Sequence, residues 1–338
     1  MKSLSVRYRP NNFDDVVCQD SIVKILKKQL ELENFSNVYL FAGPSGCGKT
    51  TIARIFANEI NKGSGNPIEI DAASNSGVDN VRTLINSAND RSLDSEYKIY
   101  IIDECHMLTN QAWNALLKTI EEPPKYTIFM FCTTDPQKIP DTIKNRCMRF
   151  NLTRIPYNDI KSRLQYICFE EGFVNFDDTI DFIAKTSRGQ MRDAIATLEK
   201  CAAYSNDLNI EDSLKAINQI SYDVLFDIIN SIIDGEEMKL INLVDSLYFT
   251  GYDMKLFIDQ FLNFCLDLSK YCIVQNMNFT QLPLFYEDKV KTSTTFENNK
   301  SYYAYVVDKL FELKNNLKTD LNPKTTVDIY LLRLARCQ

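Results

Sequence analysis

The chain has 338 residues, of which 45% are hydrophobic and 25% charged, an ordinary composition for a globular protein of about two or three domains. Its net charge of −7 excludes a protein that binds nucleic acid over its whole surface. The ten cysteines form no CxxC pair, so we expect no zinc site. Ten unpaired thiols predict that the protein lies in a reducing cytoplasm. No signal peptide or membrane span is expected, and hence no membrane partner.

Short apolar runs alternate with helical patterns in the first half of the chain. The runs read as buried parallel strands and the patterns as helices between them. The strands are expected at residues 38–42, 68–71, 98–103 and 127–134, and the helices at 50–60 and 110–122. This order predicts an α/β domain whose ligand site lies at the carboxyl ends of the strands.

Beyond residue 151 the strand signal disappears. Residues 158–204 and 210–338 read as helices, with a long polar loop expected within residues 275–300. The pattern therefore predicts one α/β domain, one small helical domain and one larger helical domain.

A phosphate-binding loop is predicted at residues 43–50, which read GPSGCGKT and match G-x-x-x-x-G-K-[ST] between a strand and a helix. Its glycines let backbone N–H groups point at phosphate oxygens. Lys49 can neutralise charge on the β- and γ-phosphates, and the Thr50 hydroxyl can ligate Mg²⁺. The alternative, a glycine-rich turn that binds nothing, is disfavoured by the flanking strand and helix.

The strand at residues 98–103 ends in two acids. Asp103 can hold Mg²⁺, and Glu104 can polarise an attacking water. A solvated acidic turn is the alternative for this pair. His106 has no cysteine or histidine at metal-ligand spacing, so we interpret it as a structural or relay group. Together with the phosphate loop, these residues predict Mg²⁺-dependent ATP hydrolysis.

Three further positions could sense or stabilise the reacting phosphate. Thr133 and Thr134 end a strand, where a hydroxyl can detect the γ-phosphate. Arg146 follows the core strands, where it can project toward another subunit, and Arg192 begins a helix. An arginine stabilises phosphoryl transfer only if folding or assembly brings it to the nucleotide. A surface salt bridge is the alternative for either one.

Taken together, these segments resemble the ATPase subunits of sliding-clamp loaders, in the AAA+ class, and above all the gamma/tau subunits of bacterial DNA polymerase III. The resemblance is dense over residues 6–202 and fainter beyond. It is carried by VRYRPNNFDDVV, DECHMLTNQAWNALLKTIEEPP, TTDPQKIP, NRCMRF and GQMRDA, and by TTVDIYLLRLA near the end. It implies an AAA+ core at 1–153, a helical lid at 154–209 and a helical collar for oligomerisation at 210–338.

The resemblance also implies which residues bind ATP and Mg²⁺. The phosphate loop would contribute Gly43, Pro44, Ser45, Gly46, Cys47, Gly48, Lys49, Thr50 and Thr51. The adenine would be surrounded by Arg7, Tyr8, Arg9, Pro10 and Val17. Asp103 and Glu104 would form the Walker B pair, with Thr50 and Asp103 on Mg²⁺.

Roles beyond the nucleotide's own pocket follow from the same resemblance. Thr134 would be sensor 1 and Arg192 sensor 2. Arg146 would be the arginine finger inserted into a neighbour's site, and Lys118 would reach across as well. Asn75, Ser76 and Gly77 would contact the DNA backbone, although a plain helix cap fits these three equally well.

The chain departs from the family pattern in four places. Residues 58–74 cross a gap where the family usually carries a four-cysteine zinc module. The family's Ser-Arg-Cys reads Asn145-Arg146-Cys147, and a family glycine is Cys18, which puts the local turn in doubt. The chain also ends at the collar, without the tau extension that binds polymerase and helicase. We expect such a short form in a compact bacterial or phage genome.

The function implied is that of an ATP-driven motor subunit of a clamp loader, which opens a ring clamp and places it on primer–template DNA. Its partners would be the sliding clamp, the other subunits of a homo- or hetero-oligomeric pentamer, and DNA, in the cytoplasm of a bacterial cell or phage-infected host. Two alternatives stay open. One is a scaffold subunit that does not hydrolyse ATP. The other is an AAA+ DNA translocase or helicase motor, which should carry basic pore loops.

Overall fold

The computed structural model describes residues 3–92 and 94–336. They divide into two compact units. The first contains the chain up to Ile167 and also Ser187–Ala196, and the second contains Cys168–Thr186 and the chain from Thr197 onward. The finer division at residues 153 and 209 stays a prediction. No helix in the described ranges is long and apolar enough to cross a membrane.

A parallel five-stranded sheet forms the centre of the first unit, in the order β2-β3-β4-β1-β5. Its strands are β1 (Val38–Ala42), β2 (Ile68–Asp71), β3 (Lys98–Asp103), β4 (Thr127–Thr133) and β5 (Met148–Asn151). Leu40 of β1 pairs with Phe131 of β4 and with Arg149 of β5. The order brings the carboxyl ends of β1, β3 and β4 side by side, which is where α/β folds bind ligands.

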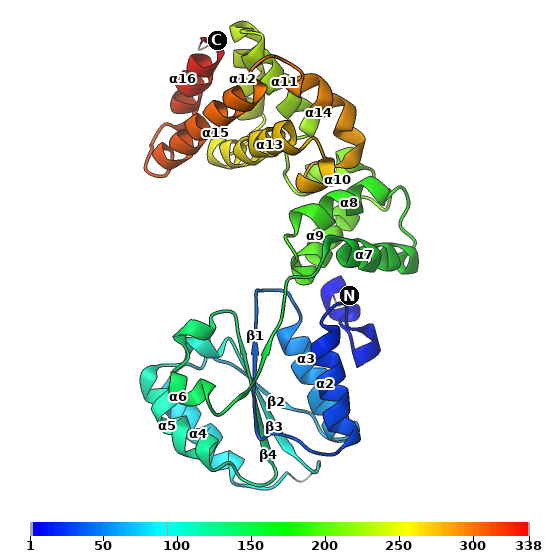
Figure 1. The fold of residues 1–338 in the computed structure, drawn as a ribbon, viewed down its shortest axis with the longest axis vertical. Coiled ribbons are helices and arrows are strands. Elements are labelled where there is room, and N and C mark those ends of the chain that lie inside the picture. Colours follow the sequence, from blue (N-terminus) through cyan, green and yellow to red (C-terminus); the bar gives the residue numbers. More distant parts are fainter. Residues whose placement is uncertain (1–2, 93, 337–338) are drawn as a thin grey trace. The chain divides into compact units, whose positions relative to one another are not determined.

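Helices cover both faces of this sheet (Figure 1). On one face lie α2 (Asp20–Glu31) and α3 (Lys49–Ile60), and on the other α4 (Val78–Ala88), α5 (Asn110–Glu121) and α6 (Asp141–Lys144). Successive side chains of β1 enter the two apolar layers in turn: Tyr39 packs in the layer of α3, and Leu40 in the layer of α5. β1 is therefore buried along its whole length.

The first unit also contains several short elements and the beginnings of two longer helices. They are α1 (Leu4–Arg7), η1 (Phe13–Asp15), η2 (Cys105–Met107), η3 (Pro136–Lys138), α7 (Tyr157–Glu171) and α9 (Met191–Tyr204). The helices α7 and α9 begin in this unit and end in the second.

The second unit is helical and has its own apolar core. Its elements are α8 (Asp177–Thr186), α10 (Ile210–Ala216), α11 (Tyr222–Ile233), α12 (Glu237–Phe249), α13 (Met254–Val274), η4 (Met277–Phe279), η5 (Leu284–Tyr286), α14 (Glu287–Thr294), α15 (Asn299–Asn316) and α16 (Pro323–Arg336). Phe257 and Phe261 of α13 and Leu310 of α15 are fully buried in the core. Part of the loop expected within residues 275–300 is helical.

The predicted fold class, an α/β domain followed by helices, is confirmed, with two differences in the sheet. The prediction that residues 68–71 form a buried strand was wrong on burial, because β2 lies at an edge of the sheet and Ile68 is 40% exposed. The other edge strand, β5, was not singled out by the sequence pattern. Edge strands carry a weaker apolar signal because a part of each one faces solvent.

Candidate nucleotide-binding site

The phosphate loop connects the end of β1 to the start of α3. Gly43 N donates to the Thr133 carbonyl of β4 at 3.1 Å, which fixes the base of the loop to the sheet. Gly46 and Gly48 have φ of 68° and 102°, the left-handed region that glycine enters without strain. Gly48 is the N-cap of α3, and no side chain caps this helix. The first N–H groups of α3 are thus available to a phosphate.

Lys49 is held at the base of the loop. Its side chain is buried, with the residue only 6% exposed, and Nζ donates to the carbonyl oxygens of Gly43 at 3.0 Å and Pro44 at 2.9 Å. A buried ammonium group attracts an anion strongly because little water screens its charge. The loop therefore presents a fixed positive charge to a phosphate.

Thr50 and Asp103 meet where α3 begins and β3 ends. Thr50 Oγ1 donates to Asp103 Oδ2 at 2.7 Å. A hydroxyl and a carboxylate are hard oxygen ligands, and Mg²⁺ commonly takes only one or two such protein ligands, with phosphate and water oxygens completing the shell. The pair fits this ion. No cluster of three or more His, Cys, Asp or Glu that could hold a metal is present among the described residues.

Glu104 follows Asp103 in a strained backbone conformation. Its φ of 44° lies in the left-handed region, which costs a non-glycine residue free energy and is often found at functional sites. Its N–H donates to Asp103 Oδ1 at 3.0 Å, and its Oε2 accepts from Thr134 Oγ1 at 3.0 Å. Thr134, the predicted sensor, thus reaches the site through Glu104.

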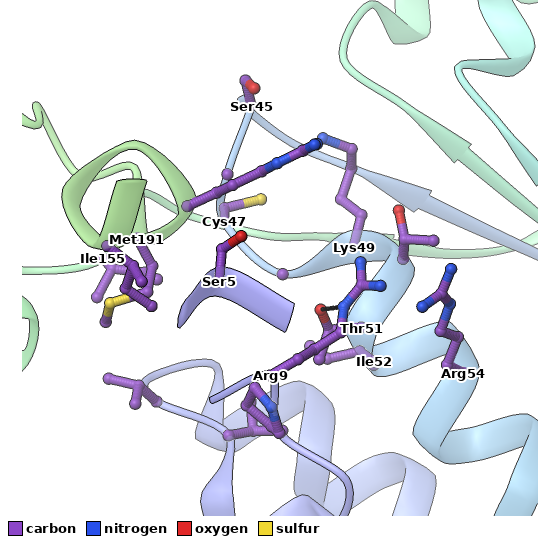
Figure 2. Close-up of a pocket in the computed structure, with 18 of the residues that line it drawn as sticks. Ser5, Arg9, Ser45, Cys47, Lys49, Thr51, Ile52, Arg54, Ile155 and Met191 are labelled. Carbon is purple, nitrogen blue, oxygen red and sulfur yellow. Dashed lines mark hydrogen bonds between the residues drawn. The ribbon is translucent and has the colours of Figure 1, made fainter. Parts of the chain in front are cut away.

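These groups open on a pocket of about 390 Å³ (Figure 2). The predicted residues that line it are Tyr8, Arg9, Pro10, Val17, Ser45, Gly46, Cys47, Gly48, Lys49, Thr50, Thr51, Asp103, Glu104 and Arg192. Three other predicted ATP contacts, Arg7, Gly43 and Pro44, do not line it. In Figure 2, Ile155 and Met191 lie on one side of the pocket and Lys49, Thr51 and Arg54 on the other.

Several lining residues were missed by the sequence analysis. They are Ser5, Val6, Val16, Ile52, Arg54, Ile155, Arg163, Met191 and Ile195. Arg54 could have been found, since it lies one helical turn after Thr50. Arg163 could not, because it joins the site only by folding: Nη2 donates to the Tyr8 carbonyl at 2.9 Å across 155 residues of sequence.

Positive charge is concentrated at this pocket. Arg9 donates from Nε to Thr51 Oγ1 at 3.2 Å. Burial, followed by repulsion from Arg54 and then from Arg192, lowers the pKa of Arg9. Arg54 is itself paired with Glu69 of β2. An anionic ligand between these groups would relieve the repulsion, so the pocket suits a polyphosphate.

The segment that leads into α9 packs directly against the phosphate loop. Met191 N donates to the Gly46 carbonyl at 3.2 Å, and a Cβ on Gly46 would lie 3.0 Å from the Cβ of Gln190. This close approach carries Arg192 to the pocket. Gly46 is thus needed for its backbone conformation and for the space it leaves to Gln190.

Arg146 and Lys118, the predicted contacts to a neighbouring subunit, lie outside the pocket. Arg146 is 39% exposed and forms an ion pair with Glu121, so the salt-bridge alternative describes its state in this chain. Lys118 is exposed on the same face of α5, one turn before Glu121. Their role in trans stays a prediction.

Asn75, Ser76 and Gly77 precede α4. Gly77 is its N-cap, and no side chain caps the helix. The Asn75 amide donates instead to the Asp71 carbonyl at 3.1 Å, and the Ser76 carbonyl accepts from Thr109 N at 3.2 Å. Gly77 therefore occupies the capping position, as the alternative predicts, but the side chains of Asn75 and Ser76 do not cap the helix. The contact of these residues with DNA stays a prediction.

Comparison with known proteins places the chain in a family. A family model described as DNA polymerase III, delta subunit, matches residues 66–156. DNA polymerase III subunit tau of Bacillus subtilis is 33% identical over 97% of this chain and 62% of its own length. The chain belongs to the DNA polymerase III gamma/tau family. The gamma/tau subunit of Mycoplasma genitalium is 31% identical over 95% of this chain and 56% of its own length.

This gamma/tau-family chain spans about 60% of the length of those two relatives. Among solved structures, the Holliday junction branch migration motor RuvB of Thermotoga maritima matches with a TM-score of 0.53 and 21% identity, over 67% of this chain and 80% of RuvB. That likeness concerns the fold alone, and it supports the α/β architecture, a parallel sheet with flanking helices, predicted for the first part of the chain. The resemblance to gamma/tau subunits is likewise confirmed.

Proposed function

We propose that this chain is the ATP-driven motor subunit of a sliding-clamp loader, which opens a ring-shaped clamp and places it on primer–template DNA. Membership of the gamma/tau family supports the biological role. The observation that carries the enzymatic part is the hydrogen bond between Thr50 and Asp103, beside Glu104, at the mouth of the phosphate loop.

ATP binding follows from the charges around the pocket. The triphosphate would accept hydrogen bonds from backbone N–H groups of the loop and of the first turn of α3. Lys49 would exchange the Gly43 and Pro44 carbonyls for the phosphate. Arg9 and Arg192 add positive charge nearby. Mg²⁺ held by Thr50 and Asp103 would neutralise charge on the β- and γ-phosphates.

Hydrolysis is assigned to Glu104 as the group that orients and deprotonates the attacking water. Thr134 donates to Oε2 of this carboxylate, which ties the strand-end sensor to the base. The loss of the γ-phosphate could thus be transmitted through Thr134 to β4.

Assembly would complete the site. Arg146 of one subunit would enter the neighbour's pocket and stabilise charge on the transferring phosphate, so an isolated subunit should hydrolyse ATP poorly. We propose an AAA+ core at 1–153, a lid at 154–209 and a collar at 210–338 that joins five subunits. Clamp and DNA would bind the ATP-bound assembly more tightly than the ADP-bound one, and this difference drives loading.

DNA contact would be local, as the net charge of −7 requires. The uncapped start of α4, with Asn75, Ser76 and Gly77, offers backbone N–H groups to a DNA phosphate. Such contacts position a duplex without reading its sequence. Loading at primer ends of any sequence needs this kind of binding.

Mixing two inactive variants tests the shared site. Lys49→Ala removes the phosphate contact of a subunit's own pocket, and Arg146→Ala removes the contribution to its neighbour. Neither variant should show DNA- and clamp-stimulated ATPase in the assembled loader, whereas a mixture should regain part of it, since some interfaces then join an intact pocket to an intact arginine. Unchanged ATPase in either single variant would contradict the interfacial model.

The two alternatives make different predictions. A scaffold subunit needs no residues for Mg²⁺ binding and hydrolysis, yet Thr50, Asp103 and Glu104 are all in place, which favours a motor subunit. A wild-type chain that binds ATP without turnover, even with its partners and primed DNA, would nevertheless support the scaffold. A helicase should separate DNA strands without a clamp, and a strand-displacement assay detects this directly.

A further inference from the structure

The only histidine of the chain lies beside the proposed catalytic base. His106 belongs to η2, directly after Asp103 and Glu104, and its side chain is only 12% exposed. Nδ1 lies 3.3 Å from Glu104 Oε2 and 3.2 Å from Thr133 Oγ1. This one ring atom therefore contacts both the base and the end of β4.

The proton on the ring can be assigned from its partners. An ionised carboxylate only accepts hydrogen bonds, so Nδ1 must carry a hydrogen to bond Glu104. The Thr133 hydroxyl oxygen already accepts from Asp135 N at 3.0 Å and can accept a second hydrogen bond from the same Nδ1–H. One ring hydrogen is then shared between Glu104 and Thr133.

Two donors converge on one oxygen of the base. Thr134 Oγ1 donates to Glu104 Oε2 at 3.0 Å, and His106 Nδ1 approaches the same atom. The described residues offer no hydrogen-bond partner to Oε1. With Oε2 occupied, the carboxylate would present Oε1 to an attacking water. Both donors also belong to the protein's own fold, so the orientation exists before nucleotide binds.

We infer that His106 is a positioning residue for ATP hydrolysis: through Nδ1–H it fixes the Glu104 carboxylate and couples it to the end of β4. The inference rests on the proposed function. Glu104 needs such support because its backbone is held in the left-handed region and its side chain is partly exposed, so it has other rotamers available. A misdirected base would slow the chemical step without altering ATP binding.

Three substitutions in the full chain, assembled with its partner subunits, clamp and primed DNA, test this role. His106→Asn keeps an N–H near the position of Nδ1, whereas His106→Gln places it near Nε2 and His106→Ala removes it. We expect Asn to keep kcat within about threefold and both others to lower it about tenfold to hundredfold, a part of the roughly 10²–10⁴-fold supplied by a general base. KM and the Kd for ATP should stay unchanged.

Other outcomes would overturn the inference. An Ala variant with wild-type kcat, or a Gln variant as active as Asn, means that Nδ1–H does not position the base. Equal loss of kcat and thermal stability in all three variants would mean a purely structural role. Glu104→Gln distinguishes a failure of the proposed function from a failure of the inference about His106. If wild type and Glu104→Gln hydrolyse ATP at the same rate, the proposed function is wrong. If Glu104→Gln is impaired but the His106 variants are not, the role of His106 is wrong.

A spectroscopic measurement gives a second, independent test. Because the chain has one histidine, its ring ¹⁵N signals need no assignment among several residues. We expect the tautomer with hydrogen on Nδ1 in the wild-type protein. A ring protonated only on Nε2 in the wild-type protein would contradict the inference, because Nδ1 would then have no hydrogen to donate.

Discussion

Arg146 and Glu121 form an ion pair with 2.7 Å between Nη2 and Oε1. The same guanidinium donates from Nη1 to the Thr142 carbonyl at 2.6 Å. The arginine proposed to enter a neighbour's nucleotide pocket is thus held on the surface of its own subunit. In the proposed assembly it would have to exchange these partners for the phosphate. Since both side chains are about 40% exposed, the exchange costs little, about 0.2–1 kcal/mol for an exposed pair.

Glu121→Gln should therefore favour assembly. Without its carboxylate partner, Arg146 is freer to reach the neighbour, and the apparent Kd for ATP-dependent association should fall by up to about fivefold. Analytical ultracentrifugation with ATP measures this, together with ATPase at limiting subunit concentration. Glu122→Gln is the matched control, because it removes the same charge from the next residue and should have no effect. Weaker association of Glu121→Gln would mean that Glu121 itself contacts the neighbour.

Gly46→Ala should weaken nucleotide binding through two effects. An alanine at φ 68° is strained, and its Cβ would lie 3.0 Å from the Cβ of Gln190, which displaces the segment that carries Arg192. We expect the Kd for ATP to rise at least about tenfold, corresponding to about 1.4 kcal/mol.

Gly63→Ala is the control for the backbone effect alone. Gly63 has a similar φ of 77°, but a Cβ there meets nothing within 4 Å. This variant should lose about 1 kcal/mol of stability and keep its ATP affinity. Isothermal titration gives both Kd values. If the two variants bound ATP equally well, the close approach of Gln190 to the loop would have no part in binding.

The features that could be predicted from the sequence are those in which neighbouring residues act together. β1, β3 and β4 are central strands, and each appears as a continuous apolar run because both faces are covered. The phosphate loop and the acidic pair at the end of β3, Asp103 and Glu104, were found for a similar reason, because each is a short stretch of sequence whose residues all face one ligand.

The missed features depend on contacts between distant residues. Arg163 reaches the site through the Tyr8 carbonyl, 155 residues away, and nothing in its local sequence marks it. The pairing of Glu121 with Arg146 is similar: Glu121 ends α5, Arg146 lies in the turn between α6 and β5, and only the fold brings the two together. Roles in trans cannot be read from either residue alone.

Cys18, at which the resemblance to the gamma/tau family implies a glycine, has φ 63°, a backbone conformation that favours glycine. A non-glycine residue in this conformation is strained by about 1–2 kcal/mol. Glycine avoids this strain but loses more conformational entropy on folding, which offsets a part of the gain. We expect Cys18→Gly to leave stability unchanged or raise it by up to about 1 kcal/mol. The β-branched Cys18→Val should lower it by about 1 kcal/mol or more.

Thermal unfolding followed by circular dichroism checks both Cys18 variants. Cys18→Ser serves as the control for loss of the thiol, since serine has nearly the same size and the same backbone preference as cysteine. Its melting temperature should match wild type. A Val variant as stable as the Gly variant would show that the turn relaxes away from the left-handed conformation.

Cys47 lies inside the phosphate loop but should resist alkylation at neutral pH. Its side chain is almost fully buried, and this burial raises the pKa of the thiol, with the nearby Lys49 charge offsetting only a part. Only the thiolate reacts, so the rate of alkylation should be low near pH 7 and should rise only at a higher pH than for an ordinary exposed cysteine. Peptide mass spectrometry after brief iodoacetamide treatment compares Cys47 with the more exposed Cys18, which should react faster. Rapid labelling of Cys47 at neutral pH would mean that the empty phosphate loop opens, and added ATP should then protect it.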